Sequence, residues 1–183
     1  MIKRELYMNR IRPFIGGELI KVMTGIRRSG KSVMLELIKE ELAEAGVAPS
    51  QMISINFEDM RYSHLQTATA LHDEIIKRAE GIEGKAYLFF DEIQEVEGWE
   101  KCVNSLRVAL DCDIYITGSN AKLLSGELAT YIGGRYVEFV IYPFSFAEFL
   151  ELYHTIAPSD SIQQCFQKYL LAGGMPYLAT VSY

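Results

Sequence analysis

The chain has 183 residues, enough for one globular domain with a small appended element. Hydrophobic residues make up 49% and charged residues 23% of the sequence, which excludes a disordered or collagen-like chain. The formal net charge of −6 argues against a basic nucleic-acid-binding surface over the whole molecule. Residues 1–40 nevertheless carry nine Lys or Arg against four Glu, a local excess that suits a polyanion but also fits ordinary charge fluctuation.

The cysteine pattern and the hydropathy bear on the cellular compartment. Cys102, Cys112 and Cys165 lie ten and 53 positions apart, which fits neither a disulfide framework nor a paired zinc-ligand spacing. We expect buried thiols in a reducing compartment. No stretch approaches the roughly 18 apolar residues of a membrane span, and no apolar signal segment follows the N-terminus. We therefore expect a cytoplasmic protein that does not bind membranes.

Apolar runs alternate with helical periodicity along most of the chain. Strands are predicted at 19–24, 52–57, 86–90, 114–117 and 136–142, and helices at 32–45, 68–79 and 99–110. This alternation is typical of an α/β fold with a mainly parallel sheet, whose ligands bind at the carboxyl ends of the strands.

The pattern changes after Pro143 to helices alone, at 146–154 and 162–171. We predict a core over residues 1–143 and a helical lid, or the start of a second domain, over 144–183. The last residues, 177–183, are largely apolar, so we expect the sequence to be part of a longer protein.

A glycine-rich segment lies between the first predicted strand and the first predicted helix. Residues 25–32 match the P-loop, or Walker A, pattern G-x-x-x-x-G-K-[ST] without a mismatch. At such a turn, backbone N–H groups and the helix N-terminus surround phosphate oxygens. We expect Lys31 to reach the β- and γ-phosphates and the Ser32 hydroxyl to bind Mg²⁺. The candidate nucleotide-binding residues here are Gly25, Ile26, Arg27, Arg28, Ser29, Gly30, Lys31, Ser32 and Val33.

Two acidic residues follow the third predicted strand, 59 positions after Ser32. Asp91 is expected to hold Mg²⁺, directly or through water, as the Walker B acid does in P-loop proteins. Glu92 is then free to orient and activate a water as a general base. Without the P-loop, the same pair would indicate only two acids that close a strand.

Two further polar features suggest contacts to a nucleotide. The turn after the fourth strand contains Ser119 and Asn120, either of which is a candidate contact for the γ-phosphate or the attacking water; a capped turn is the alternative. Arg135 is a candidate for stabilising transition-state charge, in its own subunit or across a subunit interface, as arginine fingers do. The alternative for Arg135 is a structural ion pair.

The order of these motifs resembles the ATPase domain of a prokaryotic family in the AAA superfamily. The matching stretches are 25–32, 88–94 with Trp99, 116–120, 134–135 leading to 143–146, and 173–176. The resemblance implies a P-loop NTPase three-layer sandwich with a mainly parallel five-stranded sheet and a helical lid. It further implies ATP as the nucleotide, Glu92 as the catalytic base, and a longer protein with a C-terminal domain.

The function we expect is Mg²⁺-dependent ATP hydrolysis that switches the conformation or assembly of the protein as it acts on a protein or nucleic-acid client. A homo-oligomer is one form in which the protein could act. A nucleotide-dependent binding module without turnover is one alternative, and the intact Asp91-Glu92 pair argues against it. A small-molecule kinase is another. It normally needs an arginine-bearing lid, whereas no arginine follows Pro143 in this sequence.

Overall fold

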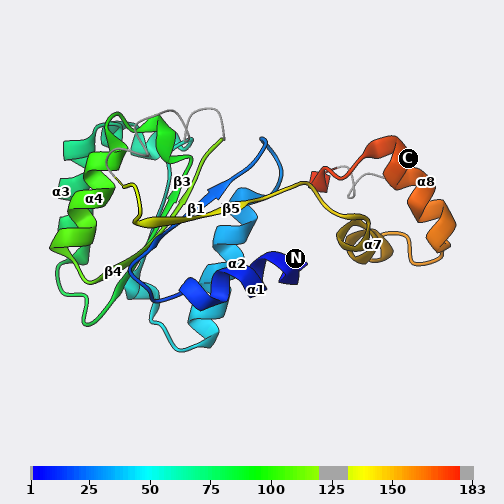
Figure 1. Cartoon of the computed structure of the whole chain (residues 1–183), viewed down its shortest axis with the longest axis horizontal. Helices are drawn as coiled ribbons and strands as arrows, with labels where there is room; N and C mark the ends of the chain where they lie inside the picture. The colour runs from blue at the N-terminus through cyan, green and yellow to red at the C-terminus, as the bar shows by residue number, and fades with distance from the viewer. Residues whose placement is uncertain (1, 120–131, 178–183) are drawn as a thin grey trace.

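The computed structural model describes residues 2–119 and 132–177. Its centre is a five-stranded sheet in the order β2-β3-β4-β1-β5 (Figure 1). The strands are β1 (Ile20–Thr24), β2 (Met52–Asn56), β3 (Ala86–Asp91), β4 (Cys112–Thr117) and β5 (Tyr136–Val140). The helices are α1 (Glu5–Ile11), α2 (Lys31–Glu44), α3 (Ala68–Ala79), α4 (Trp99–Ala109), α7 (Phe146–His154) and α8 (Ile162–Ala172).

Every strand pair in this sheet is parallel, so the carboxyl ends of all five strands lie along one edge. The register places Asn56 beside Asp91 in one pair and Met23 beside Thr117 in another. Strands β1 and β4 are buried along their whole length, as expected for central strands covered on both faces. The polar residues that end β2, β3 and β4 are therefore neighbours at that edge.

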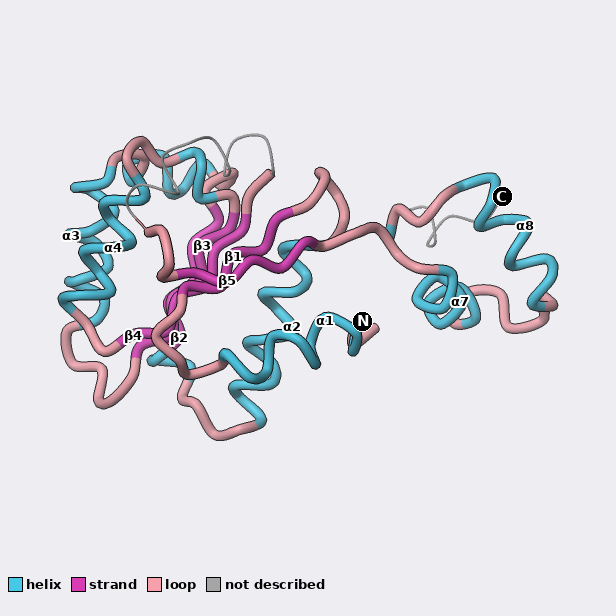
Figure 2. Tube along the Cα trace, in the orientation of Figure 1, coloured by secondary structure: helices cyan, strands magenta, loops and turns pink. Residues whose placement is uncertain are grey.

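Helices cover both faces of the sheet and give the molecule three layers. Figure 2 shows α3 and α4 on one face and α1 and α2 on the other. Each face has its own apolar core, one including Leu71 and Val103, and the other including Ile11 and Met34. The sheet carries apolar side chains into both cores, which explains why its central strands read as continuous hydrophobic runs.

Helices α7 and α8 form a separate small unit beyond the end of β5 (Figure 1). Its core contains Phe144, Phe149, Tyr153 and Cys165, and Ile2 from the other end of the chain packs among them. Both helices begin with a capping box, in which a serine and the glutamate or glutamine three residues later satisfy each other's backbone N–H groups. The predicted boundary at residue 143 stays a prediction.

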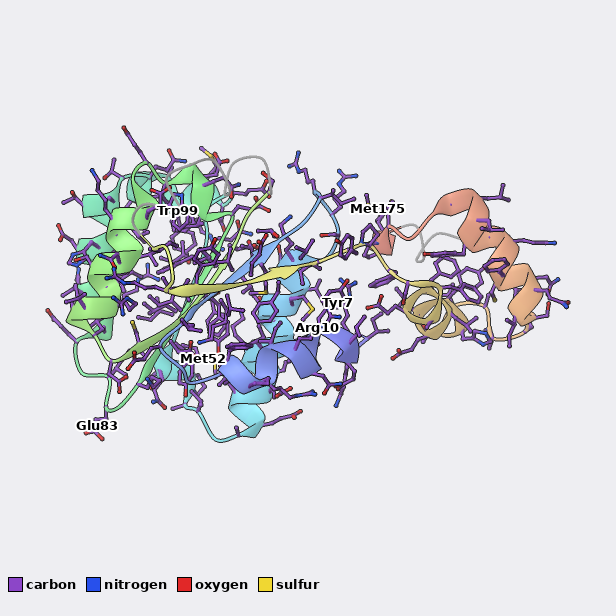
Figure 3. All side chains as sticks on the ribbon, in the orientation of Figure 1. Tyr7, Arg10, Met52, Glu83, Trp99 and Met175 are labelled. Atoms are coloured by element: carbon purple, nitrogen blue, oxygen red, sulfur yellow. The ribbon has the colours of Figure 1, made fainter. Side chains whose placement is uncertain are left out.

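A glycine lets the two ends of this unit lie close together. Phe144 N–H donates to Gly174 O at 2.6 Å, and a Cβ at Gly174 would lie 2.2 Å from Phe144 O. Tyr169 Oη also donates to Phe144 O, at 2.9 Å. Figure 3 shows Met175 at this junction, where the chain returns from α8. Only glycine allows the two backbones to approach this closely.

The predicted elements agree with the structure to within one or two residues at most ends. Two of the predicted helices, α3 and α7, have the predicted bounds. The strand predicted over 136–142 ends at Val140. Helix α1 was not predicted, because it has only seven residues and a short apolar pattern does not distinguish a helix from a strand.

The structure also bears on the predictions made from the cysteines and from the hydropathy. All three cysteines are buried and free, as predicted. Burial raises the pKa of the Cys102 thiol to about 12, so this thiol stays protonated and unreactive at neutral pH. Within residues 2–119 and 132–177, no helix has both the length and the apolar character needed to cross a membrane.

Candidate functional site

The glycine-rich loop connects the carboxyl end of β1 to the first turn of α2. Its backbone has positive φ at Gly25 (147°), Arg28 (67°) and Gly30 (98°). A Cβ at Gly25 would lie 2.2 Å from Ile141 O, on the segment that follows β5. The loop therefore depends on glycine at position 25 for both its conformation and its close approach to a neighbouring backbone.

The first turn of α2 faces this loop with its N–H groups. The residue before the helix is Gly30, and no described side chain caps the helix there. The first N–H groups of any α-helix have no acceptor inside the helix, and the helix dipole adds partial positive charge at this end. The buried Ser29 hydroxyl also has no hydrogen-bond partner among the described residues. These donors fit a phosphate group.

Lys31 lies inside the loop rather than extending into solvent. Its side chain is 4% exposed, and Nζ donates to Gly25 O at 3.3 Å and to Ile26 O at 3.4 Å. The same nitrogen lies 3.6 Å from Glu92 Oε1. The structure thus brings together the lysine predicted to reach the phosphates and the glutamate predicted to act as the base.

Asp91 ends β3 and accepts hydrogen bonds from both neighbouring strands. Thr117 Oγ1 at the end of β4 donates to Asp91 Oδ1, and Asn56 Nδ2 at the end of β2 donates to Asp91 Oδ2 at 3.3 Å. Asp91 is buried, whereas Ser32 at the start of α2 is exposed. The parallel sheet places Asp91 at the same edge as the loop that leads to Ser32.

These oxygen atoms are the ligand type that Mg²⁺ takes in nucleotide sites. Among residues 2–119 and 132–177, no three His, Cys, Asp or Glu side chains lie together as a ready metal cage. Mg²⁺ usually keeps several waters and binds one or two carboxylates together with substrate phosphates. A set of one carboxylate, from Asp91, and one hydroxyl, from Ser32, fits that chemistry.

Glu92 follows Asp91 in a left-handed conformation, with φ of 55°. This conformation is uncommon for a residue with a side chain and turns the chain sharply at the end of β3. The Glu92 N–H donates to Thr117 Oγ1 at 3.0 Å, and Gln94 Nε2 donates to Glu92 Oε2 at 2.6 Å. Thr117 therefore contacts both acidic residues, and Gln94 orients the carboxylate expected to act as a base.

Arg135 lies at the opposite edge of the sheet from the glycine-rich loop at 25–30, called the phosphate loop below after its P-loop sequence pattern. Its carbonyl accepts from the N–H of Ile20, the first residue of β1, and Nη1 donates to Asn104 Oδ1 on α4 at 3.0 Å. The five residues of β1, at about 3.3 Å each, separate it from the loop by roughly 16 Å. This geometry does not bring Arg135 to the loop of its own chain, and its action within its own subunit or across a subunit interface stays a prediction.

The remaining predicted site residues lie outside or at the margin of this arrangement. Asn120 lies outside the described residues. Arg27 is exposed and pairs with Glu58 at 3.2 Å, and Arg28 is also exposed. Both arginines are on the solvent side of the loop, as is Ile26, which is 53% exposed.

Four residues at or near the site were not identified as functional from their spacing in the sequence. They are Arg4, Asn56, Gln94 and Thr117. Thr117 ends the strand just before the polar turn that the sequence singled out, where Ser119 and Asn120 were the residues favoured. Arg4 gave no signal, because a single arginine near an N-terminus is normally exposed.

A family model described as an AAA domain matches residues 18–150, a span that includes the phosphate loop and all five strands. The chain belongs to this AAA domain family.

Two relatives agree with this assignment. An uncharacterized protein of Haemophilus influenzae is 44% identical over 176 residues, covering 96% of this chain and 44% of that protein. An uncharacterized protein of Methanocaldococcus jannaschii is 35% identical over 171 residues, covering 88% of this chain and 36% of that protein. The AAA domain therefore spans less than half the length of either relative.

Solved structures of distant sequence share the fold. DnaA from Aquifex aeolicus, bound to AMPPCP, matches with a TM-score of 0.63 at 14% identity and covers 97% of this chain and 58% of that one. The ORC1 protein of Aeropyrum pernix, in complex with DNA, has a TM-score of 0.58 at 18% identity and covers 85% of this chain and 49% of that one. These likenesses confirm the predicted P-loop NTPase fold of the AAA domain.

An apolar cavity lies beside the phosphate loop of the AAA domain. Its volume is about 290 Å³, and it is lined by residues from the N-terminus, from α2 and from the α7–α8 unit, among them Ile2, Val33, Phe144, Leu152 and Tyr177. Val33 follows Ser32 directly, so the cavity begins where the phosphate loop ends. Arg4 also lines this cavity, and the other walls are apolar, which suits the flat ring of a base.

Proposed function

We propose that this AAA domain binds ATP with Mg²⁺ and hydrolyses it, and that the cycle drives a change in its conformation or assembly. The observation that carries this proposal is the convergence of Lys31, Asp91 and Glu92 at one edge of the sheet, with Lys31 Nζ 3.6 Å from Glu92 Oε1. P-loop ATPases need a phosphate-binding cation, a metal-binding carboxylate and a water-activating group at one place. The membership of the chain in the AAA domain family supports the same function.

Binding would use groups that belong to the loop and its surroundings. The N–H groups at the start of α2 and the Lys31 ammonium group would bind the phosphates, and the apolar cavity beside Val33 would receive the base. Ser32 and Asp91 would hold Mg²⁺, which when bound offsets the negative charge on the phosphate oxygens. To bind phosphate, Lys31 exchanges its contacts with Gly25 O and Ile26 O for the ligand.

Hydrolysis would depend on Glu92. Its carboxylate would orient a water and accept its proton while the water oxygen bonds to the γ-phosphorus and the bond to the bridging oxygen of ADP breaks. Gln94 would hold the carboxylate in place through the 2.6 Å hydrogen bond to Oε2. Arg135 of an adjacent copy would stabilise the charge that develops on the phosphate oxygens, and Asn120 would contact the γ-phosphate or the water.

The deciding experiment measures Mg²⁺-dependent phosphate release from ATP over a range of protein concentrations. We expect turnover in the wild-type chain, loss of turnover in Glu92→Gln, and unchanged turnover in Glu97→Gln, a control at an exposed glutamate five residues away. A specific activity that rises with concentration would support a homo-oligomer. Turnover retained by Glu92→Gln would contradict the assigned role of Glu92.

A nucleotide-dependent binding module is the second candidate. It shares every phosphate contact proposed above and differs only in lacking turnover, so ATP binding without phosphate release in the wild-type chain would favour it. A small-molecule kinase would instead transfer the phosphate to an acceptor, and phosphate release would then depend on that acceptor.

The client of the proposed cycle is a protein or a nucleic acid. The ORC1 structure holds DNA, which makes DNA the first nucleic acid to test. DNA bound through phosphate contacts would lose affinity steeply as the salt concentration rises. An affinity that does not change with salt would remove such contacts as the basis of binding.

A further inference from the structure

Arg4 lies where three separate parts of the chain meet. Its Nη1 donates to Ser29 O of the phosphate loop at 2.9 Å, and its Nη2 donates to Tyr142 O, after β5, at 2.8 Å. Its Nε donates to Glu148 Oε1 in the first turn of α7 at 2.7 Å. One guanidinium group thus joins the phosphate loop, the end of the sheet and the α7–α8 unit.

The burial of Arg4 makes these contacts strong and interdependent. Its side chain has no exposed surface, and that of Glu148 is 13% exposed. The guanidinium carbon lies 4.6 Å from the centre of the Tyr7 ring and 5.1 Å from that of Phe144. A buried charge is costly unless it is paired and hydrogen-bonded. The position of Arg4 therefore depends on Glu148 as well as on the loop.

The backbone of Arg4 supports a role beyond packing. Arg4 has φ of 46° and ψ of 48°, in the left-handed region that residues with a Cβ rarely adopt. Such strain persists only where the surrounding structure determines the conformation, and it clusters at functional sites. Here the residue is held at both ends: the Arg4 carbonyl accepts from the N–H groups of Tyr7 at 2.9 Å and Met8 at 3.2 Å at the start of α1, and the side chain makes the contacts described above.

The contact with Ser29 O also sets the direction of a phosphate-binding N–H group. None of the described peptide bonds is cis. In a trans peptide the carbonyl and the following N–H point in opposite directions. Because Arg4 holds the Ser29 carbonyl on its own side of the loop, the N–H of Gly30 must point away from Arg4.

We propose that Arg4 is a positioning residue that couples the orientation of the phosphate-loop N–H groups to the placement of helix α7 through Glu148. Displacement of α7 leaves the buried guanidinium without its carboxylate and weakens its hold on Ser29 O. Conversely, a phosphate bound to the loop stabilises the arrangement in which Arg4 contacts both partners. The functional part of this inference rests on the proposed ATP binding.

The first test uses hydrogen–deuterium exchange and needs no nucleotide. Glu148→Gln removes the charge that pairs with Arg4 but keeps the capping box with Ser145, because glutamine also serves at that position. We expect faster exchange over residues 26–31 in Glu148→Gln than in the wild-type chain. The matched control is Glu151→Gln, at an exposed glutamate on the same helix, and it should leave that exchange unchanged. Equal exchange in Glu148→Gln and the wild type would overturn the coupling.

The second test measures Mg·ATP affinity by calorimetry in the wild type, Glu148→Gln, Arg4→Lys and the double variant. Loss of a charge-assisted hydrogen bond should weaken affinity about tenfold in each single variant. The double variant should bind no more weakly than Arg4→Lys alone. Fully additive losses would overturn the coupling.

A melting curve of each variant separates misfolding from a local effect. If Arg4→Lys does not fold, the comparison of Glu148→Gln with Glu151→Gln still decides the inference. A wild-type chain that binds no ATP would contradict the proposed function, and the exchange measurement would then judge the coupling separately.

Discussion

Lys31 Nζ lies 3.6 Å from Glu92 Oε1, so the lysine proposed to bind phosphate forms an ion pair with the glutamate proposed to activate water. To contact a phosphate, Lys31 must weaken this pair. Glu92→Gln removes the ionic attraction, and we expect it to bind Mg·ATP about threefold more tightly than the wild type, because Lys31 no longer gives up a carboxylate partner to reach the phosphate. Calorimetric titration with ATP measures this difference. Weaker binding would show instead that Glu92 holds Lys31 in its phosphate-binding position.

Thr117 connects the two acidic residues of the site. Thr117→Val keeps the shape of the side chain. It removes the hydroxyl that donates to Asp91 and leaves the Glu92 N–H without its acceptor. We expect the free energy of unfolding to fall by about 1–3 kcal/mol and kcat to fall more than the affinity for ATP. Urea unfolding and steady-state kinetics measure these effects. Thr117→Ser restores the hydroxyl and should restore both quantities; failure to do so would point to packing of the methyl group.

Arg135 does not lie beside the phosphate loop of its own chain, which makes its proposed action across an interface testable by mixing. Arg135→Ala and Lys31→Ala should each lose turnover, and arginine fingers contribute roughly 10³–10⁵ in kcat. An equimolar mixture should regain part of the activity, because an intact loop from one variant then meets an intact arginine from the other. Arg78→Ala, at an arginine of α3 that pairs with Glu74, is the control and should retain turnover. No recovery in the mixture would argue against the interface role.

Lys21 and Asp113 form an ion pair in which neither side chain has exposed surface. Burial lowers the pKa of Lys21, while the adjacent Asp113 carboxylate opposes that shift. Lys21→Met leaves Asp113 buried without its cation, and we expect a loss of about 3–5 kcal/mol in the free energy of unfolding.

Urea unfolding measures the effect of Lys21→Met against a matched surface pair. Lys85 pairs with Asp111 at 2.6 Å, with side chains that are 27% and 68% exposed. Lys85→Met should therefore cost less than about 1 kcal/mol. Similar losses in the two variants would mean that Asp113 is satisfied by its hydrogen bonds from Gly16 N–H and Tyr115 Oη.

Glu148 gives the fold a specific sensitivity to acid. Burial alone would raise the pKa of its carboxyl, but hydrogen bonds from Arg4 and Ser145 outweigh burial and hold the pKa below the ordinary value of 4.5. A carboxylate with a lowered folded-state pKa stabilises the fold above its unfolded pKa, and this contribution is lost as the pH falls through the folded-state pKa.

The melting temperature as a function of pH tests this contribution. We expect the wild type to melt at a higher temperature than Glu148→Gln near neutral pH, and the two curves to converge only as the pH falls below 4.5 and through the lowered folded-state pKa of Glu148. Other carboxylates with lowered pKa values, such as Glu74 and Asp160, are present in both proteins and cancel in the comparison. A difference that stays constant with pH would show that the charge of Glu148 contributes nothing.

The local pattern of the sequence predicted most of the secondary structure and the core of the site. Continuous apolar runs marked the buried strands, and the glycine pattern at 25–32 marked the turn before α2. The pair Asp91 and Glu92 was identified because it directly follows such a run. These features depend on residues a few positions apart, where periodicity and turn preferences act.

The sequence by itself therefore determined the fold class, the phosphate loop and the two acidic residues. Only the tertiary structure decided which polar groups surround them. Arg4 and Glu148 are 144 positions apart, and Thr117 and Asp91 are 26 apart. Such contacts arise from the strand order and from the way the N-terminal segment reaches α7, which no local pattern encodes. The same strand order places Arg135 at the far edge, because β5 pairs in parallel with β1 and begins where β1 begins.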